Sequence, residues 1–212
     1  MWMPGGGHWG LAPGQITDDS ELAMCQLRGL VAGQGKLDPF HLALFYGYWV
    51  YCGPFDIGMT TINGLGPLRE DLANPNPNLA YAAAKTGMGA TSLSNGSMMK
   101  TTPLAVWARN LSLEELEKCV QADVAMMHSK REMWDLVTAY CLAIKTLIKN
   151  TEREDRAEMA LNAVREYGEK EGKTVLISQS LSEAQAIIDQ IKNQQTGEIP
   201  EYFNIDVYNP QE

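Results

Sequence analysis

The chain has 212 residues, a formal net charge of −9 and an apolar fraction of 45%. This length suits one domain with its own hydrophobic core, so we expect a single domain over residues 1–212. The ordinary composition excludes a disordered chain. The acidic balance argues against a nucleic-acid partner, and no apolar run approaches the roughly 20 residues that span a bilayer.

The four cysteines are scattered and form no CxxC pair. Their spacing is too sparse for a secreted disulfide scaffold and unsuitable for zinc. The first residues have neither the basic region nor the apolar core of a signal peptide. We therefore expect reduced thiols and a cytoplasmic protein with no membrane partner.

Helical signals follow one another along the chain after a Gly- and Pro-rich loop that runs to about Gly14. The short segment Thr174–Ile177 could be a strand, but an apolar helix start explains it equally well. Ser112 and Glu115 have the spacing of a capping box. Predicted helices cover about 18–31, 39–51, 112–128, 132–149, 156–170 and 182–192. Three shorter helices are expected between the second and third of these: one capped by Asp56, one that begins at 79 and one that begins near 97. The sequence thus predicts an all-α fold of about eight helices.

Thr17, Asp18 and Asp19 stand together where the first helix begins. A hydroxyl and two carboxylates offer the oxygen ligands that suit Mg²⁺, Mn²⁺ or Ca²⁺. The helix end carries roughly half a positive charge, which two ionised aspartates outweigh. The alternative is that Asp18 or Asp19 is only an N-cap, with Glu21 completing a capping box.

A second candidate is the small-residue loop Ser94–Lys100, which we expect to lead into a helix near Ser97. Free backbone N–H groups at such a helix start bind phosphate, and Lys100 in the first turn would add a charged contact. The alternative is an Asn-Gly turn followed by a Ser97 N-cap.

His128 is the third candidate, expected near the end of the helix that starts after Ser112. Because a helix C-terminus favours histidine anyway, a structural role is the better explanation from this residue alone. Trp9 could line a pocket from the glycine-rich loop, whereas His8 and His41 carry less information. The C-terminal stretch 200–212 is apolar in places and has no helical stop, so we expect it to be a connection.

Taken together, these segments resemble the ADP-ribosylglycohydrolase family, which includes dinitrogenase reductase-activating, ADP-ribosylarginine and ADP-ribosylserine hydrolases. The run from Gly5 to Glu21, GGGHWGLAPGQITDDSE, is similar to the family's Gly-rich segment and TDDT motif. NGSMMKTTPL, from Asn95 to Leu104, is similar to its NGxxMRxxPL segment, and His128 falls where the family has a Thr-His pair. The resemblance covers about residues 5–150.

The resemblance implies an orthogonally packed all-α fold with two Mg²⁺ (or Mn²⁺) ions in a cleft that receives ADP-ribose. Thr17, Asp18 and Asp19 would be metal ligands. The diphosphate would lie at Gly96, Ser97 and Met98, on a loop supported by Asn95 and Lys100. His128 would form the ribose or adenine side. The implied reaction is hydrolysis of the bond between ADP-ribose and a protein side chain.

Several features depart from the family pattern. Ser20 stands in place of Thr, Lys100 in place of Arg, and Met127 in place of the Thr before the histidine. A leading GDALG-type helix and a C-terminal DxDTxA motif, which completes the metal site in the family, do not occur in this sequence. We therefore expect a fragment, a chain completed by a second chain or oligomer, or a relative that does not catalyse. The alternative function is a non-catalytic ADP-ribose-binding or crystallin-like structural protein.

Overall fold

The structure is a computed structural model that describes residues 5–7 and 9–193. In these ranges every regular element is a helix, apart from one isolated bridge between Gly6 and Leu11, which confirms the all-α prediction. None of these helices is long and apolar enough to cross a membrane. The α-helices are α1 (Asp18–Ala32), α2 (Pro39–Tyr51), α3 (Met59–Leu65), α4 (Pro77–Thr86), α5 (Thr102–Trp107), α6 (Leu113–Val124), α7 (Arg131–Lys149), α8 (Arg156–Gly168) and α9 (Val175–Asn193). Four short 3-10 helices connect them: η1 (Gly66–Arg69), η2 (Met88–Ala90), η3 (Asn95–Ser97) and η4 (Ala108–Asn110).

Side-chain caps explain where several helices begin. Before α2, Asp38 Oδ1 accepts a hydrogen bond of 2.9 Å from the Phe40 amide, and Pro39 occupies the first helical position. Before α6, the predicted capping box is present: the Glu115 amide donates to Ser112 Oγ at 3.2 Å, and the Ser112 amide donates to Glu115 Oε2 at 2.8 Å. The segment 174–177, which the sequence allowed as a strand or as a helix start, leads into α9 at Val175. The helical interpretation is therefore correct.

The α-helix predicted from near Ser97 is wrong. Residues 95–97 form the 3-10 helix η3, and α5 begins only at Thr102. Pro103 accounts for the delay, because it has no N–H to donate and its ring would clash with the preceding turn of a longer helix. Proline is tolerated only in the first turn, and that is where α5 has it.

Two other predicted boundaries also move. The cap of the short helix α3 is Gly58 and not Asp56. Helix α6 ends at Val124, so His128 follows the helix through a turn in which its amide donates to the Val124 carbonyl at 2.8 Å. The predicted tail after residue 200, like His8, lies outside the described residues.

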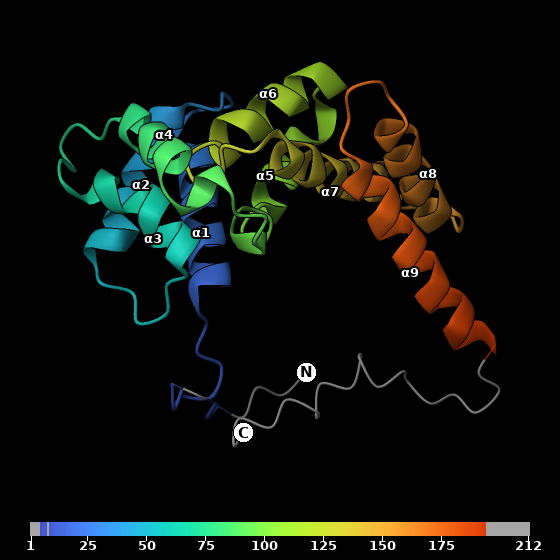
Figure 1. Ribbon diagram of the computed structural model, residues 1–212, viewed down its shortest axis with the longest axis horizontal. Coiled ribbons are helices and arrows are strands. Elements are labelled where there is room, and N and C mark those ends of the chain that lie inside the picture. The colour runs from blue at the N-terminus through green and yellow to red at the C-terminus, as the bar shows by residue number, and fades with distance from the viewer. Residues whose placement is uncertain (1–4, 8, 194–212) are drawn as a thin grey trace.

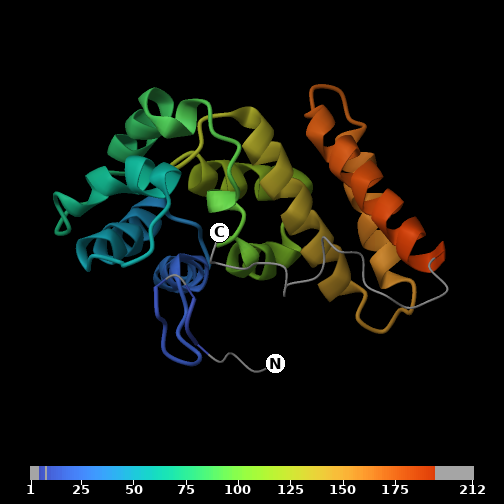
Figure 2. The same cartoon turned by 60° about the horizontal axis from the view of Figure 1, so that its bottom comes forward.

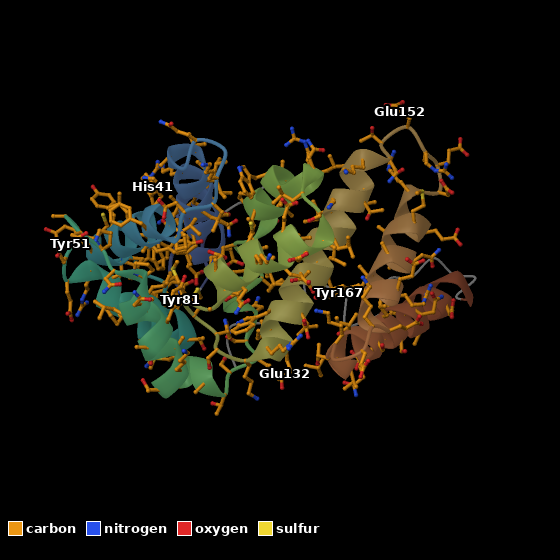
Figure 3. The ribbon with its side chains drawn as sticks, turned by 90° about the horizontal axis from the view of Figure 1, so that it is seen from above. His41, Tyr51, Tyr81, Glu132, Glu152 and Tyr167 are labelled. Atoms are coloured by element: carbon orange, nitrogen blue, oxygen red, sulfur yellow. The ribbon has the colours of Figure 1, made fainter. Side chains whose placement is uncertain are left out.

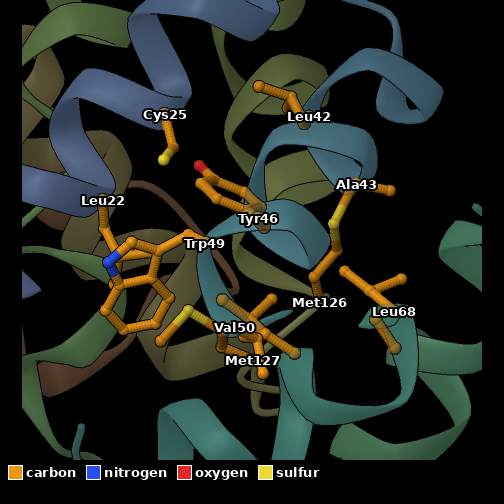
Figure 4. Close-up of a cluster of buried hydrophobic side chains, with 12 residues drawn as sticks. Leu22, Cys25, Leu42, Ala43, Tyr46, Trp49, Val50, Leu68, Met126 and Met127 are labelled. Atoms are coloured by element: carbon orange, nitrogen blue, oxygen red, sulfur yellow. The ribbon is translucent and has the colours of Figure 1, made fainter. Parts of the chain in front are cut away.

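The helices form two groups that meet along α1 and α5 (Figure 1). Helices α1 to α4 make the first group, and α5, α6 and α7 make the second. Helices α8 and α9 pack on α7 and form the end of the molecule farthest from the first group (Figure 2). The first core includes buried side chains from α1, α2 and the turn after α6, as Figure 4 shows: Leu22, Cys25, Leu42, Ala43, Tyr46, Trp49, Val50, Leu65, Leu68, Ala80, Met126 and Met127.

The turn after α6 passes between α3 and η2 at backbone contact distance. A Cβ atom on Gly64 would lie 2.4 Å from the Met126 carbonyl oxygen, and one on Gly89 would lie 2.1 Å from the Met127 carbonyl oxygen. Only glycine allows approaches this close. These contacts fix the position of His128, the next residue along the chain.

A buried polar network joins the two groups of helices. The Lys100 ammonium forms an ion pair with Asp123 and donates to the Tyr46 hydroxyl at 2.9 Å, with all three side chains inaccessible to solvent. Tyr46 donates to the second Asp123 oxygen at 2.6 Å, and Gln26 Nε2 donates to Asp123 Oδ2 at 3.0 Å. The Gln26 side-chain oxygen accepts from the Leu104 amide at 3.0 Å, which brings α5 into the network.

Lys100→Met should destabilise the fold by about 3 kcal/mol or more, because it leaves the Asp123 carboxylate buried without its counter-ion. Urea unfolding at neutral pH measures the change. Adding Asp123→Asn should recover part of the loss, because the amide carries no charge. The control is Lys118→Met at an exposed ion pair, where we expect a change within about 0.5 kcal/mol. Equal losses in both single variants would contradict this assignment.

Candidate functional site

Parts of the predicted metal-binding and phosphate-binding segments line one cavity of about 170 Å³. Asp18 contributes from the start of α1, and Asn95 and Gly96 from η3, 77 and 78 residues later in the sequence. The start of α3 and the residues flanking η3 complete the lining: Gly58, Met59, Thr60, Thr61, Ser94 and Met99. Figure 2 shows the N-terminal loop that precedes α1 on the same side of the molecule as the start of that helix.

The Asp18 carboxylate is not engaged as a helix cap. Thr17 occupies the N-cap position and makes no side-chain capping bond, while Asp18 is the first residue of the helix. Glu21 does not complete a capping box, since its carboxylate accepts a 2.7 Å hydrogen bond from Trp49 Nε1. The capping interpretation of this motif is therefore wrong. Asp18 Oδ1 accepts only the neighbouring Asp19 amide, at 3.1 Å, among the described residues.

Negative charge accumulates around Asp18. Partial burial raises the pKa of Asp18, and the nearby carboxylates of Asp56 and Asp19 raise it further. Asp56 lies in the connection between α2 and α3. From the sequence we expected it only to cap a helix. No local pattern distinguishes it, because its approach to Asp18 depends on how α2 packs against α1. Three carboxylates thus interact at this end of the cavity.

The loop around η3 keeps the features of an anion site although no α-helix begins there. The backbone amides of Asn95, Gly96 and Ser97 have no hydrogen-bond partner among the described residues. Successive free amides of this kind form concave sites for anions. Met98 differs, since its amide donates to the Asn95 carbonyl at 2.7 Å and its side chain packs on the core.

The buried side chain of His128 is hydrogen-bonded to this loop from the interior of the protein. The ring is inaccessible to solvent, with Nδ1 2.7 Å from Ser97 Oγ and Nε2 3.3 Å from Ser94 Oγ. Burial, reinforced by the charge of Lys100, lowers the pKa of His128 to about 4. The ring is therefore neutral at neutral pH and makes hydrogen bonds to the loop without adding charge. These bonds also exclude the interpretation of Ser97 as an N-cap.

Hydroxyl groups extend this support to α3. Ser94 Oγ donates to Thr60 Oγ1 at 3.2 Å, and Ser92 Oγ lies 3.0 Å from both of those hydroxyl oxygens. Thr60 and Ser92 were not predicted as site residues, because single hydroxyl residues have no distinguishing sequence pattern. Lys100 differs from its prediction: its ammonium is buried on Asp123, so it supports the loop from the core and cannot contact a phosphate in the cavity.

The donors at this cavity suit Mg²⁺ or Mn²⁺ by type, since they are carboxylate and hydroxyl oxygens. A divalent cation would also relieve the repulsion among Asp18, Asp19 and Asp56. However, no group of three or more acidic, histidine or cysteine side chains in the described ranges converges on one point. The residues present therefore fit part of the shell of a hard cation.

The sequence is similar to those of a known protein family. The ADP-ribosylglycohydrolase family model matches residues 1–208. The chain belongs to the ADP-ribosylglycohydrolase family. A putative ADP-ribosyl glycohydrolase of Acanthamoeba polyphaga mimivirus is 32% identical over 145 residues, which is 66% of this chain and 41% of that protein.

Two further relatives of the family are bacterial. The ADP-ribosyl-[dinitrogen reductase] glycohydrolase of Rhodospirillum rubrum is 30% identical over 69% of this chain and 44% of its own length. An ADP-ribosylarginine hydrolase of Pseudomonas putida (strain GB-1) is 29% identical over 77% of this chain and 43% of its own length. The chain thus spans less than half the length of these three relatives.

The stability of this ADP-ribosylglycohydrolase-family chain should fall as the pH drops from 6.5 towards about 4, because the unfolded state takes up a proton on His128 that the folded state excludes. The loss from this residue should reach at most roughly 3 kcal/mol. Urea unfolding across this pH range measures it. His128→Gln should flatten the dependence, whereas His41→Gln, outside the network, should retain it. An unchanged slope in His128→Gln would refute the assignment.

Proposed function

We propose that this chain serves in the Mg²⁺-dependent hydrolysis of the glycosidic bond between ADP-ribose and a modified protein side chain. The observation that carries the proposal is the single cavity lined by both Asp18 and the η3 loop with its free amides. ADP-ribose presents an anionic diphosphate and, at its far end, ribose hydroxyls next to the bond that is cleaved. Amides suit the diphosphate, and carboxylates suit a cation and hydroxyls.

Each group has a role in this proposal. The amides of Asn95 and Gly96, which line the cavity, donate to diphosphate oxygens, and His128 holds their loop in place through Ser94 and Ser97. A neutral His128 suits this role. Its ring holds the loop through hydrogen bonds to side-chain hydroxyl groups, and the backbone N–H groups of the loop stay available to an anion. The loop is thus held by hydrogen bonds to a neutral ring at Ser94 and Ser97 and, from the core, by the ion pair of Lys100 with Asp123.

Thr17, Asp18 and Asp19 would hold Mg²⁺, together with ligands beyond those gathered here. A bound Mg²⁺ supplies Lewis acidity towards a water molecule or the leaving group. In this proposal Asp56 would accept the proton near Asp18, since its charge acts on Asp18. One relative is named for ADP-ribosylarginine and another for modified dinitrogen reductase, which supports an ADP-ribosylated protein as substrate.

Binding without turnover is the second candidate function. It is favoured by the fact that the described residues bring together only part of a metal shell. In that case ADP-ribose would bind to the η3 loop and no product would be released. Mass spectrometry of ADP-ribosylated arginine and serine peptides incubated with the chain and Mg²⁺ separates the two: loss of the ADP-ribosyl group shows hydrolysis, and binding with unchanged peptides shows the second candidate.

Asp18→Asn should have opposite effects on stability and on ligand binding. In EDTA the variant should unfold about 2 °C or less above the wild type, because it removes a charge that burial, Asp56 and Asp19 disfavour. With ADP-ribose and millimolar Mg²⁺, the wild type should gain further stability that the variant lacks, since a ligand of the folded state raises the unfolding midpoint. Differential scanning fluorimetry measures both.

The matched control for Asp18→Asn is Glu154→Gln, which removes one negative charge from an exposed position in the turn before α8. It should respond to Mg²⁺ and ADP-ribose as the wild type does. If Asp18→Asn gains as much stability from Mg²⁺ and ADP-ribose as the control, Asp18 is not a metal ligand.

A further inference from the structure

A second pocket, of about 410 Å³, lies between α4, α6 and the start of α7. It shares no lining residue with the cavity at Asp18. Its volume is in the range of small-molecule sites, roughly 300–1,000 Å³. Figure 3 labels Tyr81 on α4 and Glu132 in the first turn of α7, two of the elements around it. The lining consists of Tyr81, Lys85, Lys118, Gln121, Ala122, Ala125, Ser129 and Trp134.

Two aromatic rings in this lining are held by hydrogen bonds to backbone carbonyls. Trp134 Nε1 donates to the His128 carbonyl at 2.8 Å, and the Tyr81 hydroxyl donates to the Ala122 carbonyl at 3.0 Å. The polar end of each side chain is thus already satisfied, so what it offers a ligand is its ring. Ala122 and Ala125 contribute only methyl groups, which leaves room beside the rings. Such a lining favours a flat apolar body.

The charged groups of the pocket are both cationic. Lys85 comes from α4 and Lys118 from α6, and none of the described lining residues is a carboxylate. Lys85 forms no ion pair with any described residue, and Lys118 contacts only the exposed Glu114 at 2.6 Å, a surface pair that contributes little. In a chain with a net charge of −9, two ammonium groups thus line this pocket without a carboxylate, whereas Glu114, Glu117 and Asp135 line the adjoining pocket on the other side of Lys118 and Trp134.

We propose that this pocket binds a small planar organic anion, an aromatic ring system that carries a sulfonate, carboxylate or phosphate group. The ring system would lie against Trp134 and Tyr81, and the acidic group would lie between Lys85 and Lys118. The aromatic part supplies apolar contact area, and the two ammonium groups select for negative charge. The proposal does not depend on the function of the cavity at Asp18.

Isothermal titration calorimetry with 1-naphthalenesulfonate tests the proposal on the full chain. We expect one saturable site, and an affinity that falls about fivefold in Lys85→Gln and in Lys118→Gln, the loss expected for one partly exposed charge. Both lysines are exposed, so these variants keep the fold. Lys36→Gln, at an exposed lysine between α1 and α2, should bind as the wild type does.

Two further ligands separate the contributions of ring and charge. The neutral 1-naphthalenesulfonamide and inorganic sulfate should each bind at least about fivefold more weakly than 1-naphthalenesulfonate. Equal affinity for the sulfonamide, or for sulfate, would overturn the proposed ligand class. The absence of saturable binding at millimolar ligand, or unchanged affinity in both lysine variants, would overturn the site itself.

Discussion

The ion pair between Lys100 and Asp123 constrains the placement of everything else in this molecule. A charge in a solvent-free interior is tolerated only beside its counter-ion, so the turn after η3 and helix α6 must stay together. Gln26 and Tyr46 bind the same carboxylate, which ties α1 and α2 to that point. Asp18 lies eight residues before Gln26 on α1, about 12 Å along a rigid helix. The network therefore sets the distance between Asp18 and the η3 loop.

The sequence predicts most helices correctly where the signal is local. The capping box at Ser112, the Pro39 start and the apolar periodicity of α7 each need only neighbouring residues. The helix predicted from near Ser97 is wrong for a local reason, Pro103, but the predicted role of Lys100 is wrong because the decisive contact is distant: the lysine forms its ion pair in the core with Asp123. No local pattern indicates that a lysine in a polar loop is buried.

The candidate site is predictable to the same extent. The adjacent Asp18 and Asp19 indicate metal chemistry by composition alone, and Asn95 and Gly96 indicate a turn with free amides. Asp56 joins them only through the packing of α2, so sequence spacing does not reveal it. Clustered carboxylates without a counter-ion destabilise a fold. Their repulsion therefore contributes nothing to stability, which is one ground for the cation site proposed above.

His128 lines neither of the two pockets, but it is hydrogen-bonded to a lining residue of each, Ser94 and Trp134. Its ring is hydrogen-bonded to Ser94 and Ser97 of the η3 loop. Its carbonyl accepts a hydrogen bond from Trp134, which lines the pocket between α4, α6 and α7. Close glycine contacts leave the preceding residues, Met126 and Met127, little freedom to move. Trp134 and the η3 loop are therefore both hydrogen-bonded to one residue whose position is fixed by backbone packing.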